Sequence, residues 1–150
     1  ILAKDIPVDV RFLELMPIGE GKEGETISNT TLFQKIKEIY PDIKPDERKH
    51  GNGPAIYYKI PGFEGSIGFI SAIHGGFCDS CNRLRMTSTG ELKPCLCYDE
   101  TISVRDVARC GDSEKIRENI KHAIQIKPKK HCFSEIEKVS EKKKMAQIGG

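Results

Sequence analysis

Four of the six cysteines lie within a stretch of 20 residues, and this crowding constrains the fold more than any other feature of the chain. Cys78 and Cys81 have C-x-x-C spacing, and Cys95 follows after the 13 residues 82–94. A C-x-x-C turn brings two sulfur atoms close enough to share one metal centre. Three thiolates indicate either a structural zinc site with a fourth ligand or an iron–sulfur cluster with one open iron.

Disulfide bonds are the alternative use of cysteines in this number. We favour metal binding, because no signal peptide is visible and charged residues make up 31% of the chain. No apolar run approaches the roughly 20 residues needed to cross a bilayer. The net charge of +2 is too small to indicate nucleic acid as a partner. We therefore expect a cytoplasmic protein, and because it begins with Ile1 rather than Met, we expect it to start inside a longer one.

The choice between zinc and an iron–sulfur cluster depends on the neighbours of the cysteines. Cys97 or His74 could supply a fourth zinc ligand, so a closed tetrahedral site in a zinc-binding interaction module stays open as an alternative. Arg83 and Arg85 favour the cluster, because a purely structural site needs no fixed cations beside it. Guanidinium groups two residues apart on an extended strand point the same way and match phosphate oxygens.

The remaining chain predicts an α+β fold. Apolar–charged alternation before Pro17, β-rich runs and a Ser-Thr-Gly turn predict strands over residues 8–16, 54–60, 65–70, 84–87 and 91–94. Helical spacing and capping residues predict helices over 29–40, 103–110 and from 112 or 113 to 127. The hairpin over 84–94 should carry Cys95 back towards Cys78 and Cys81. We expect a loop over 43–53 and a solvated, extended Lys-rich tail from Lys127.

The run F-C-x-x-C-N-R-L-R-M-T-x-x-G-x-L-K-x-C-L, residues 77–96, resembles the C-terminal cluster motif of the GTP 3′,8-cyclases. These are radical S-adenosylmethionine (SAM) enzymes of the first step of molybdenum cofactor biosynthesis. Residues 11–17 resemble the family's R-F-I-E-F-M-P strand, and residues 68–71 resemble the strand before its cysteines. Gly149 and Gly150 resemble the family's double-glycine tail. The likeness covers essentially the whole chain.

The resemblance also implies an architecture. Residues 1–20 correspond to the last strand of an incomplete β/α barrel and its loop. Residues 21–126 correspond to a C-terminal domain, an antiparallel sheet with helices that holds an iron–sulfur site, and 127–150 to a tail ending in Gly-Gly. The family's N-terminal C-x-x-x-C-x-x-C loop, whose cluster cleaves SAM, is absent from this chain. The implied partners are therefore GTP, the missing N-terminal barrel and a second copy in a homodimer.

The resemblance finally assigns roles to residues. Cys78, Cys81 and Cys95 would ligate a 4Fe–4S cluster whose open iron binds the guanine of GTP. The other implied site residues are Arg83, Leu84 and Arg85 at GTP, Met16 at SAM, and Gly149 and Gly150 in a tail that reaches the active site. Cys97, Cys110 and Cys132 match no ligand, and we expect buried or free thiols there. The implied reaction converts GTP to (8S)-3′,8-cyclo-7,8-dihydroguanosine 5′-triphosphate, and we expect the chain alone to be inactive.

Overall fold

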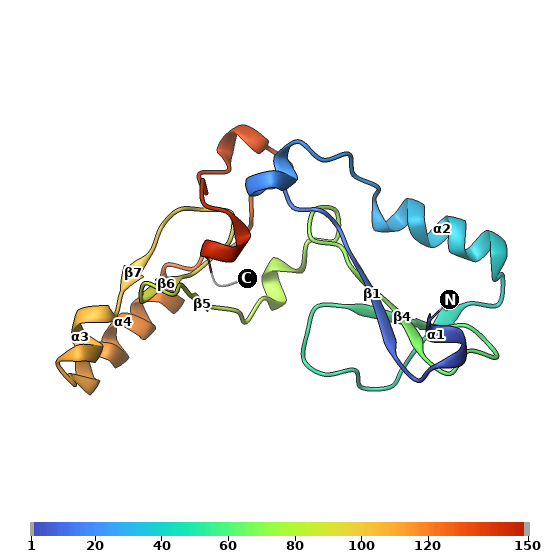
Figure 1. The fold of residues 1–150 in the computed structure, drawn as a ribbon, viewed down its shortest axis with the longest axis horizontal. Coiled ribbons are helices and arrows are strands. Elements are labelled where there is room, and N and C mark those ends of the chain that lie inside the picture. Colours follow the sequence, from blue (N-terminus) through green and yellow to red (C-terminus); the bar gives the residue numbers. More distant parts are fainter. Residues whose placement is uncertain (1, 149–150) are drawn as a thin grey trace. The chain divides into compact units, whose positions relative to one another are not determined.

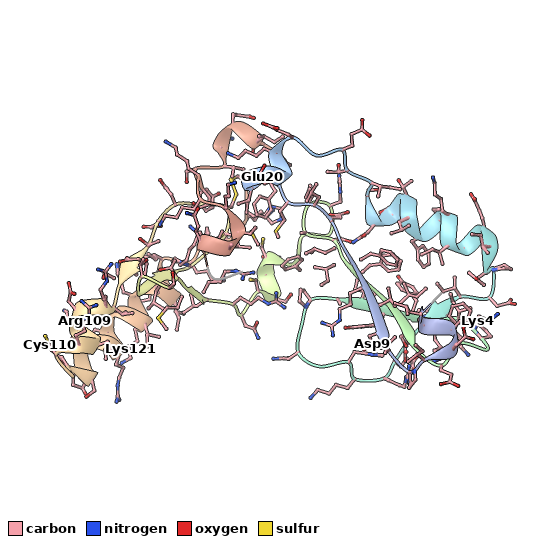
Figure 2. The ribbon with its side chains drawn as sticks, in the orientation of Figure 1. Lys4, Asp9, Glu20, Arg109, Cys110 and Lys121 are labelled. Carbon is pink, nitrogen blue, oxygen red and sulfur yellow. A yellow bond between two sulfur atoms is a disulfide. The ribbon has the colours of Figure 1, made fainter. Side chains whose placement is uncertain are left out.

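The computed structural model describes residues 2–148 (Figure 1). The chain forms two compact units, and the side chains of both are drawn in Figure 2. The sheet unit comprises Ile1–Leu15 and Glu25–Phe77. The cysteine unit comprises Met16–Gly24 and Cys78–Gly150.

A four-stranded sheet forms the sheet unit, in the order β1-β4-β3-β2. Its strands are β1 (Asp9–Leu13), β4 (Ser66–Ile70), β3 (Ile56–Lys59) and β2 (Lys44–Pro45). β1 runs parallel to β4, with Phe12 opposite Phe69, and the other pairs are antiparallel. The predicted strands are confirmed, but the loop expected over 43–53 is wrong at β2, because two residues there complete the sheet edge against β3.

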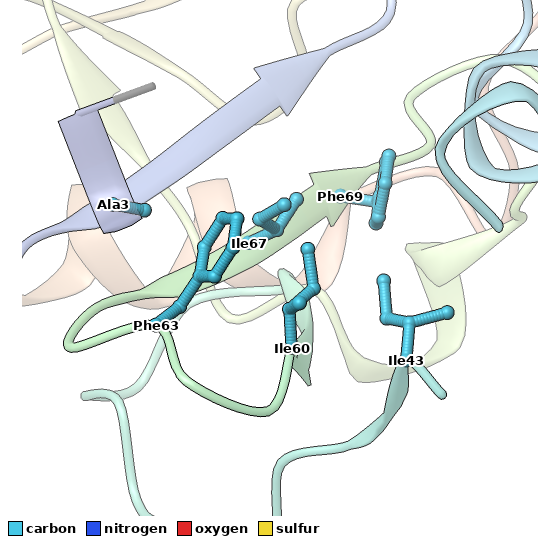
Figure 3. Close-up of a cluster of buried hydrophobic side chains, with 6 residues drawn as sticks. All are labelled: Ala3, Ile43, Ile60, Phe63, Ile67 and Phe69. Carbon is cyan, nitrogen blue, oxygen red and sulfur yellow. The ribbon is translucent and has the colours of Figure 1, made fainter. Parts of the chain in front are cut away.

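One apolar cluster, shown in Figure 3, holds the sheet unit together. Helix α2 (Asn29–Ile39) is capped by Ser28, whose Oγ accepts the Thr31 N–H at 3.1 Å. Helix α1 (Leu2–Asp5) is a single short turn. The helical spacing of its apolar residues lets α2 pack one face on the cluster, and the Phe33 ring meets Phe69 edge-on at 5.8 Å. The buried members are Ala3, Ile43, Ile60, Phe63, Ile67 and Phe69.

A smaller antiparallel sheet, ordered β5-β6-β7, forms the cysteine unit with two helices. The strands are β5 (Arg85–Met86), β6 (Glu91–Lys93) and β7 (Ile102–Ser103), and the helices are α3 (Arg105–Arg109) and α4 (Ser113–Gln125). Gly90 turns the β5–β6 hairpin with φ +80°, and a Cβ there would come within 2.9 Å of the Arg105 Cβ. Asp112 caps α4 by accepting the Lys115 N–H at 2.9 Å, as its sequence predicts.

The Lys-rich tail is packed, so the prediction of a solvated, extended segment is wrong for its described part. Phe133, Val139 and Ile148 are buried, and η3 (Ile136–Lys138) and η4 (Met145–Gln147) are short 3-10 turns. The apolar residues are too far apart to give a helix or strand period, and the lysines between them face solvent. Two further 3-10 turns are η1 (Gly19–Lys22) and η2 (Phe77–Ser80).

The predicted α+β class is confirmed, with one mixed and one antiparallel sheet. The incomplete barrel and the division at residues 20 and 126 stay predictions. None of the helices within residues 2–148 is long and apolar enough to span a membrane.

Candidate functional site

The C-x-x-C segment lies on η2 and the residue that follows it. The Cys81 N–H donates to the Cys78 carbonyl at 3.0 Å and closes this turn. Both thiols are half-buried. The Cys78 sulfur accepts the His131 N–H from the tail at 3.4 Å. The turn therefore presents two partly accessible sulfurs, one of which already has a backbone donor.

Cys95 returns to this segment through the β5–β6 hairpin, in which Arg85 lies opposite Lys93. Burial raises the pKa of the Cys95 thiol, and the charges of Cys78 and Cys81 raise it further. The Cys97 N–H and the Lys127 ammonium act in the opposite direction. The three cysteine sulfurs thus lie within electrostatic reach of one another. A cavity of about 190 Å³ adjoins Cys95, lined by Pro94, Cys95, Tyr98, Glu100 and Pro128.

The chemistry of the three candidate ligands, Cys78, Cys81 and Cys95, suits an iron–sulfur cluster held by thiolates. Three half-buried thiols are available, and backbone N–H groups bond the Cys78 and Cys95 sulfurs, as they do around clusters. Within residues 2–148, however, no three His, Cys, Asp or Glu side chains converge closely enough to hold a metal ion. The ligand set Cys78, Cys81 and Cys95 therefore stays a prediction.

Cys97 and Cys132 are buried but form a disulfide, with their Cα atoms 6.3 Å apart, so the prediction of buried or free thiols is wrong in that these two are not thiols. The packing of the tail brings together residues that are 35 apart in sequence, which no spacing rule reveals. Cys110 is free and exposed at the end of α3, as expected, and is labelled in Figure 2. With its sulfur in a disulfide and fully buried, Cys97 is not available as the fourth ligand of a zinc site.

His74, the other candidate zinc ligand, belongs to a network around the buried Glu14 in the sheet unit. The Glu14 carboxylate accepts the N–H groups of Ile73 at 2.8 Å, His74 at 3.0 Å and Asn29 at 3.1 Å, and contacts His74 Nδ1 at 3.1 Å. Burial alone would raise the pKa of Glu14, but these donors outweigh it and lower the pKa. One carboxylate thus joins the end of β1, the start of α2 and the loop that leads to Cys78. The sequence places Glu14 on a strand face and assigns it no role.

Arg83 is exposed just before β5, and Arg85 is half-buried within it. Burial lowers the pKa of the Arg85 guanidinium, and the charge of Arg83 lowers it further, whereas the charge of Cys81 raises it. The two cations are therefore close enough to repel each other, next to a cysteine of the turn. Such a pair is stabilised by a bound anion, and guanidinium groups match phosphate oxygens in shape. Leu84, between them, packs on the core of this unit, which is formed by Leu92, Val104 and Ala123.

Lys127 holds the cysteine hairpin closed, although the sequence suggests only the start of a tail. Its Nζ donates to the carbonyls of Arg83 and Pro94, each at 2.8 Å. One side chain therefore joins Arg83, two residues before β5, to Pro94, the residue before Cys95. No local sequence signal distinguishes this lysine from its neighbours.

A buried ion pair between Lys93 and Glu141 also supports the hairpin that leads to Cys95. Lys93 and Glu141 side chains are 1% and 2% exposed, and Lys93 Nζ also donates to the Tyr98 carbonyl. Burial alone would raise the pKa of Glu141, but the Lys93 ammonium and backbone N–H groups outweigh it and lower the pKa. The sequence does not reveal this pair, because both residue types usually lie on the surface.

The other predicted site residues are Met16, Gly149 and Gly150. Met16 is half-buried two residues before Ile18, which is buried in the cysteine unit. Gly149 and Gly150 lie outside the described residues. The contacts of Met16 with a cofactor and the role of the tail glycines stay predictions.

Comparison with known proteins identifies the family. Residues 8–133 match the family model described as Molybdenum Cofactor Synthesis C. The chain belongs to the Molybdenum Cofactor Synthesis C family. The match includes all three candidate cysteine ligands and both arginines, and it confirms the resemblance seen in the sequence.

Relatives of this chain carry the name GTP 3′,8-cyclase. The protein of Clostridium perfringens strain 13 is 45% identical over 150 residues, which are 99% of this chain and 46% of the relative. Those of Alkaliphilus metalliredigens and Desulforamulus reducens are 40% and 37% identical over 152 and 153 residues, with the same coverage. The chain thus spans about half the length of these curated relatives.

Proposed function

We propose that this chain is the C-terminal, GTP-binding part of a radical SAM GTP 3′,8-cyclase. Such a lyase converts GTP to (8S)-3′,8-cyclo-7,8-dihydroguanosine 5′-triphosphate in the first step of molybdenum cofactor biosynthesis, and we place it in the cytoplasm. The observation that carries the proposal is the pair Arg83 and Arg85 beside the turn that holds Cys81, in a chain of this family.

Cys78, Cys81 and Cys95 are the residues that would hold a 4Fe–4S cluster. When bound with three cysteines, such a cluster supplies an iron with an open position for a nitrogen or oxygen of the guanine. The half-buried thiols and the backbone donors on Cys78 and Cys95 support this ligand set. Lys127 and the Lys93–Glu141 pair would hold the hairpin, and with it Cys95, at a constant position.

Arg83 and Arg85 would bind the triphosphate of the same GTP molecule. Holding a substrate at its base and at its phosphates restricts both its position and its orientation. Leu84 would line the site between them while it anchors this segment on the apolar core. The half-buried position of Arg85 excludes part of the surrounding water, which strengthens its attraction for an anion.

The chain alone would lack turnover. The cluster that cleaves SAM would belong to the N-terminal barrel, and Met16 would contact SAM from this side. Gly149 and Gly150 would approach the substrate, where the absence of side chains allows a close approach. We assign residues 1–20 to the barrel, 21–126 to the cluster- and GTP-binding domain and 127–150 to the tail, and propose a homodimer for the whole enzyme.

The test is GTP binding by single arginine variants of the anaerobically reconstituted chain. Arg83→Ala and Arg85→Ala should each weaken GTP binding about tenfold or more, since a hydrogen bond to a charged group contributes about 1.5–3 kcal/mol. Iron and sulfide contents should stay unchanged. Arg109→Ala, an exposed arginine at the end of α3 that Figure 2 labels, is the matched control and should bind GTP normally. Loss of the cluster with normal GTP affinity would contradict the assigned roles.

A second measurement tests whether the chain needs an N-terminal radical SAM part for turnover. The purified chain should form no cyclic product from GTP, SAM and a reductant, and addition of the N-terminal part of a relative should restore activity. Product formation by the chain alone would show that it needs no N-terminal barrel.

A further inference from the structure

His131 is a tail residue that lies against the cysteine turn. Its backbone N–H donates to the Cys78 sulfur at 3.4 Å, and its ring stacks on Phe133 with centroids 4.7 Å apart. The ring Nε2 is buried and has no hydrogen-bond partner among the described residues. A buried polar atom with no partner is rare in native proteins and calls for a partner outside the protein, such as an ordered water or a bound group.

The hydrogen bond at the other ring nitrogen, Nδ1, determines what kind of partner the His131 Nε2 needs. The Phe133 N–H donates to His131 Nδ1 at 3.3 Å, so Nδ1 uses its lone pair there. In a neutral imidazole the proton is then on Nε2, which makes Nε2 a donor. A metal ion at Nε2 would require the lone pair on that atom and a proton on Nδ1, directly opposed to the Phe133 N–H. His131 is therefore suited to donate to an acceptor and not to ligate a metal.

We propose that His131 is a positioning residue whose Nε2–H donates a hydrogen bond to a sulfur atom of the iron–sulfur centre held by Cys78, Cys81 and Cys95. This inference rests on the proposed function. Its support is the contact that the His131 backbone already makes with the Cys78 sulfur. Thiolate and sulfide sulfurs are acceptors, and hydrogen bonds to them help to set the reduction potential of a cluster. The tail would thus tune the centre electronically, besides packing against the hairpin.

The reduction potential of the reconstituted 150-residue chain tests this role. His131→Phe keeps an aromatic ring on Phe133 but removes the donor, so the potential should become more negative while iron and sulfide contents stay constant. His131→Gln retains an N–H donor and should lie between this variant and the unaltered chain. His122→Phe replaces an exposed histidine on α4 and is the matched control, with no shift expected. An unchanged potential in His131→Phe, with an intact cluster, would overturn the inference.

A second readout does not depend on a folded variant. In the unaltered chain whose histidines carry ¹⁵N in the imidazole ring alone, with an unlabelled backbone, the reduced cluster should show a weak ¹⁵N hyperfine coupling that persists on addition of GTP. A strong coupling, typical of a direct ligand, or no coupling at all would overturn the inference. A chain that takes up no iron and sulfide would overturn the proposed function together with this inference. With a cluster present, failure of the histidine tests overturns the inference alone.

Discussion

The two units of this chain are stabilised by different kinds of interaction. The sheet unit has an apolar core in which α2 packs on the sheet, and its members recur with helix or strand periods. In the described part of the cysteine unit, a cluster of Leu92, Val104 and Ala123 packs beside its helices, and buried apolar residues of the tail are joined to the rest by polar and covalent links. Those links are Lys93–Glu141, Cys97–Cys132, Lys127 to two carbonyls, and His131 to Cys78.

This difference favours the cysteine unit as the part of the protein that binds a ligand. Buried polar links fix side-chain and backbone positions more than they stabilise a fold, and they cost free energy if one partner is lost. Three of these links reach the hairpin or the turn that carries the candidate cysteines, and the disulfide starts at Cys97, two residues after Cys95. The tail is therefore a structural component of the cysteine unit, whereas the sheet unit combines a larger apolar core with the hydrogen bonds of the buried Glu14.

The largest expected effect is in the sheet unit. Phe69→Ala should lower the free energy of unfolding of this unit by about 4 kcal/mol, because it removes a buried ring that contacts Phe33, Tyr58 and Phe12. Hydrogen exchange of the β3 and β4 amides measures this loss. Ile56→Ala, opposite Phe69 in the sheet register but 64% exposed, should cost less than about 1 kcal/mol. Equal losses in both variants would contradict an apolar core at Phe69.

In the cysteine unit, Glu141→Ala should cost about 3 kcal/mol, because it leaves the Lys93 ammonium buried without its partner. Exchange of the β6 amides reports the loss. The double variant Lys93→Met/Glu141→Leu should recover most of it, since no buried charge remains. Glu118→Ala breaks the exposed pair with Lys115 and should cost about 0–1 kcal/mol. A double variant as unstable as Glu141→Ala would show that the unpaired charge of Lys93 does not cause the loss.

Reduction of the Cys97–Cys132 disulfide should cost about 2–3 kcal/mol, because it frees a long loop in the unfolded chain. Non-reducing peptide mapping should first recover these two cysteines in one cross-linked fragment. The stability of the cysteine unit should then fall on addition of a thiol, and Cys110→Ser should leave that fall unchanged. A map that pairs Cys97 with Cys78, Cys81 or Cys95 would rule out a tail-to-hairpin link.

The smallest effect concerns Glu14, a buried carboxylate of the sheet unit that accepts several backbone N–H groups. Glu14→Gln should cost about 1–2 kcal/mol near neutral pH, since an amide replaces a charged acceptor. The lowered pKa of Glu14 means that its stabilisation is present above the usual value of 4.5 and is lost as the pH falls through the lower folded value. Unfolding of Glu14→Gln should therefore depend less on pH below 4.5 than unfolding of the unaltered chain. Glu38→Gln, exposed on α2, should keep the original pH profile.

The sequence predicted those parts of the fold that follow a periodic pattern. Strand β1, helix α2 and the β3–β4 and β5–β6 hairpins appear where alternation, helical spacing and turn residues place them. The three cysteines and the two arginines of the candidate site could also be identified, because their spacing is local. Family resemblance supplied their proposed roles.

The rest could not be predicted because it depends on contacts between segments far apart in the chain. Phe133, Val139 and Ile148 have no common period, so the tail seemed polar although it is packed. The partners Cys97 and Cys132, and Lys93 and Glu141, are ordinary residues until the tail folds back to the hairpin. Glu14 similarly gains its role only when the loop after β4 reaches the end of β1.

We propose that Cys78, Cys81 and Cys95 hold a cluster with one iron open to GTP. Electron paramagnetic resonance of the anaerobically reconstituted chain, before and after addition of GTP, tests it most directly when iron, sulfide and zinc are measured on the same sample. We expect iron and sulfide in equal amounts and a spectrum that changes with GTP. Zinc without sulfide, or an iron–sulfur spectrum that GTP leaves unchanged, would contradict it.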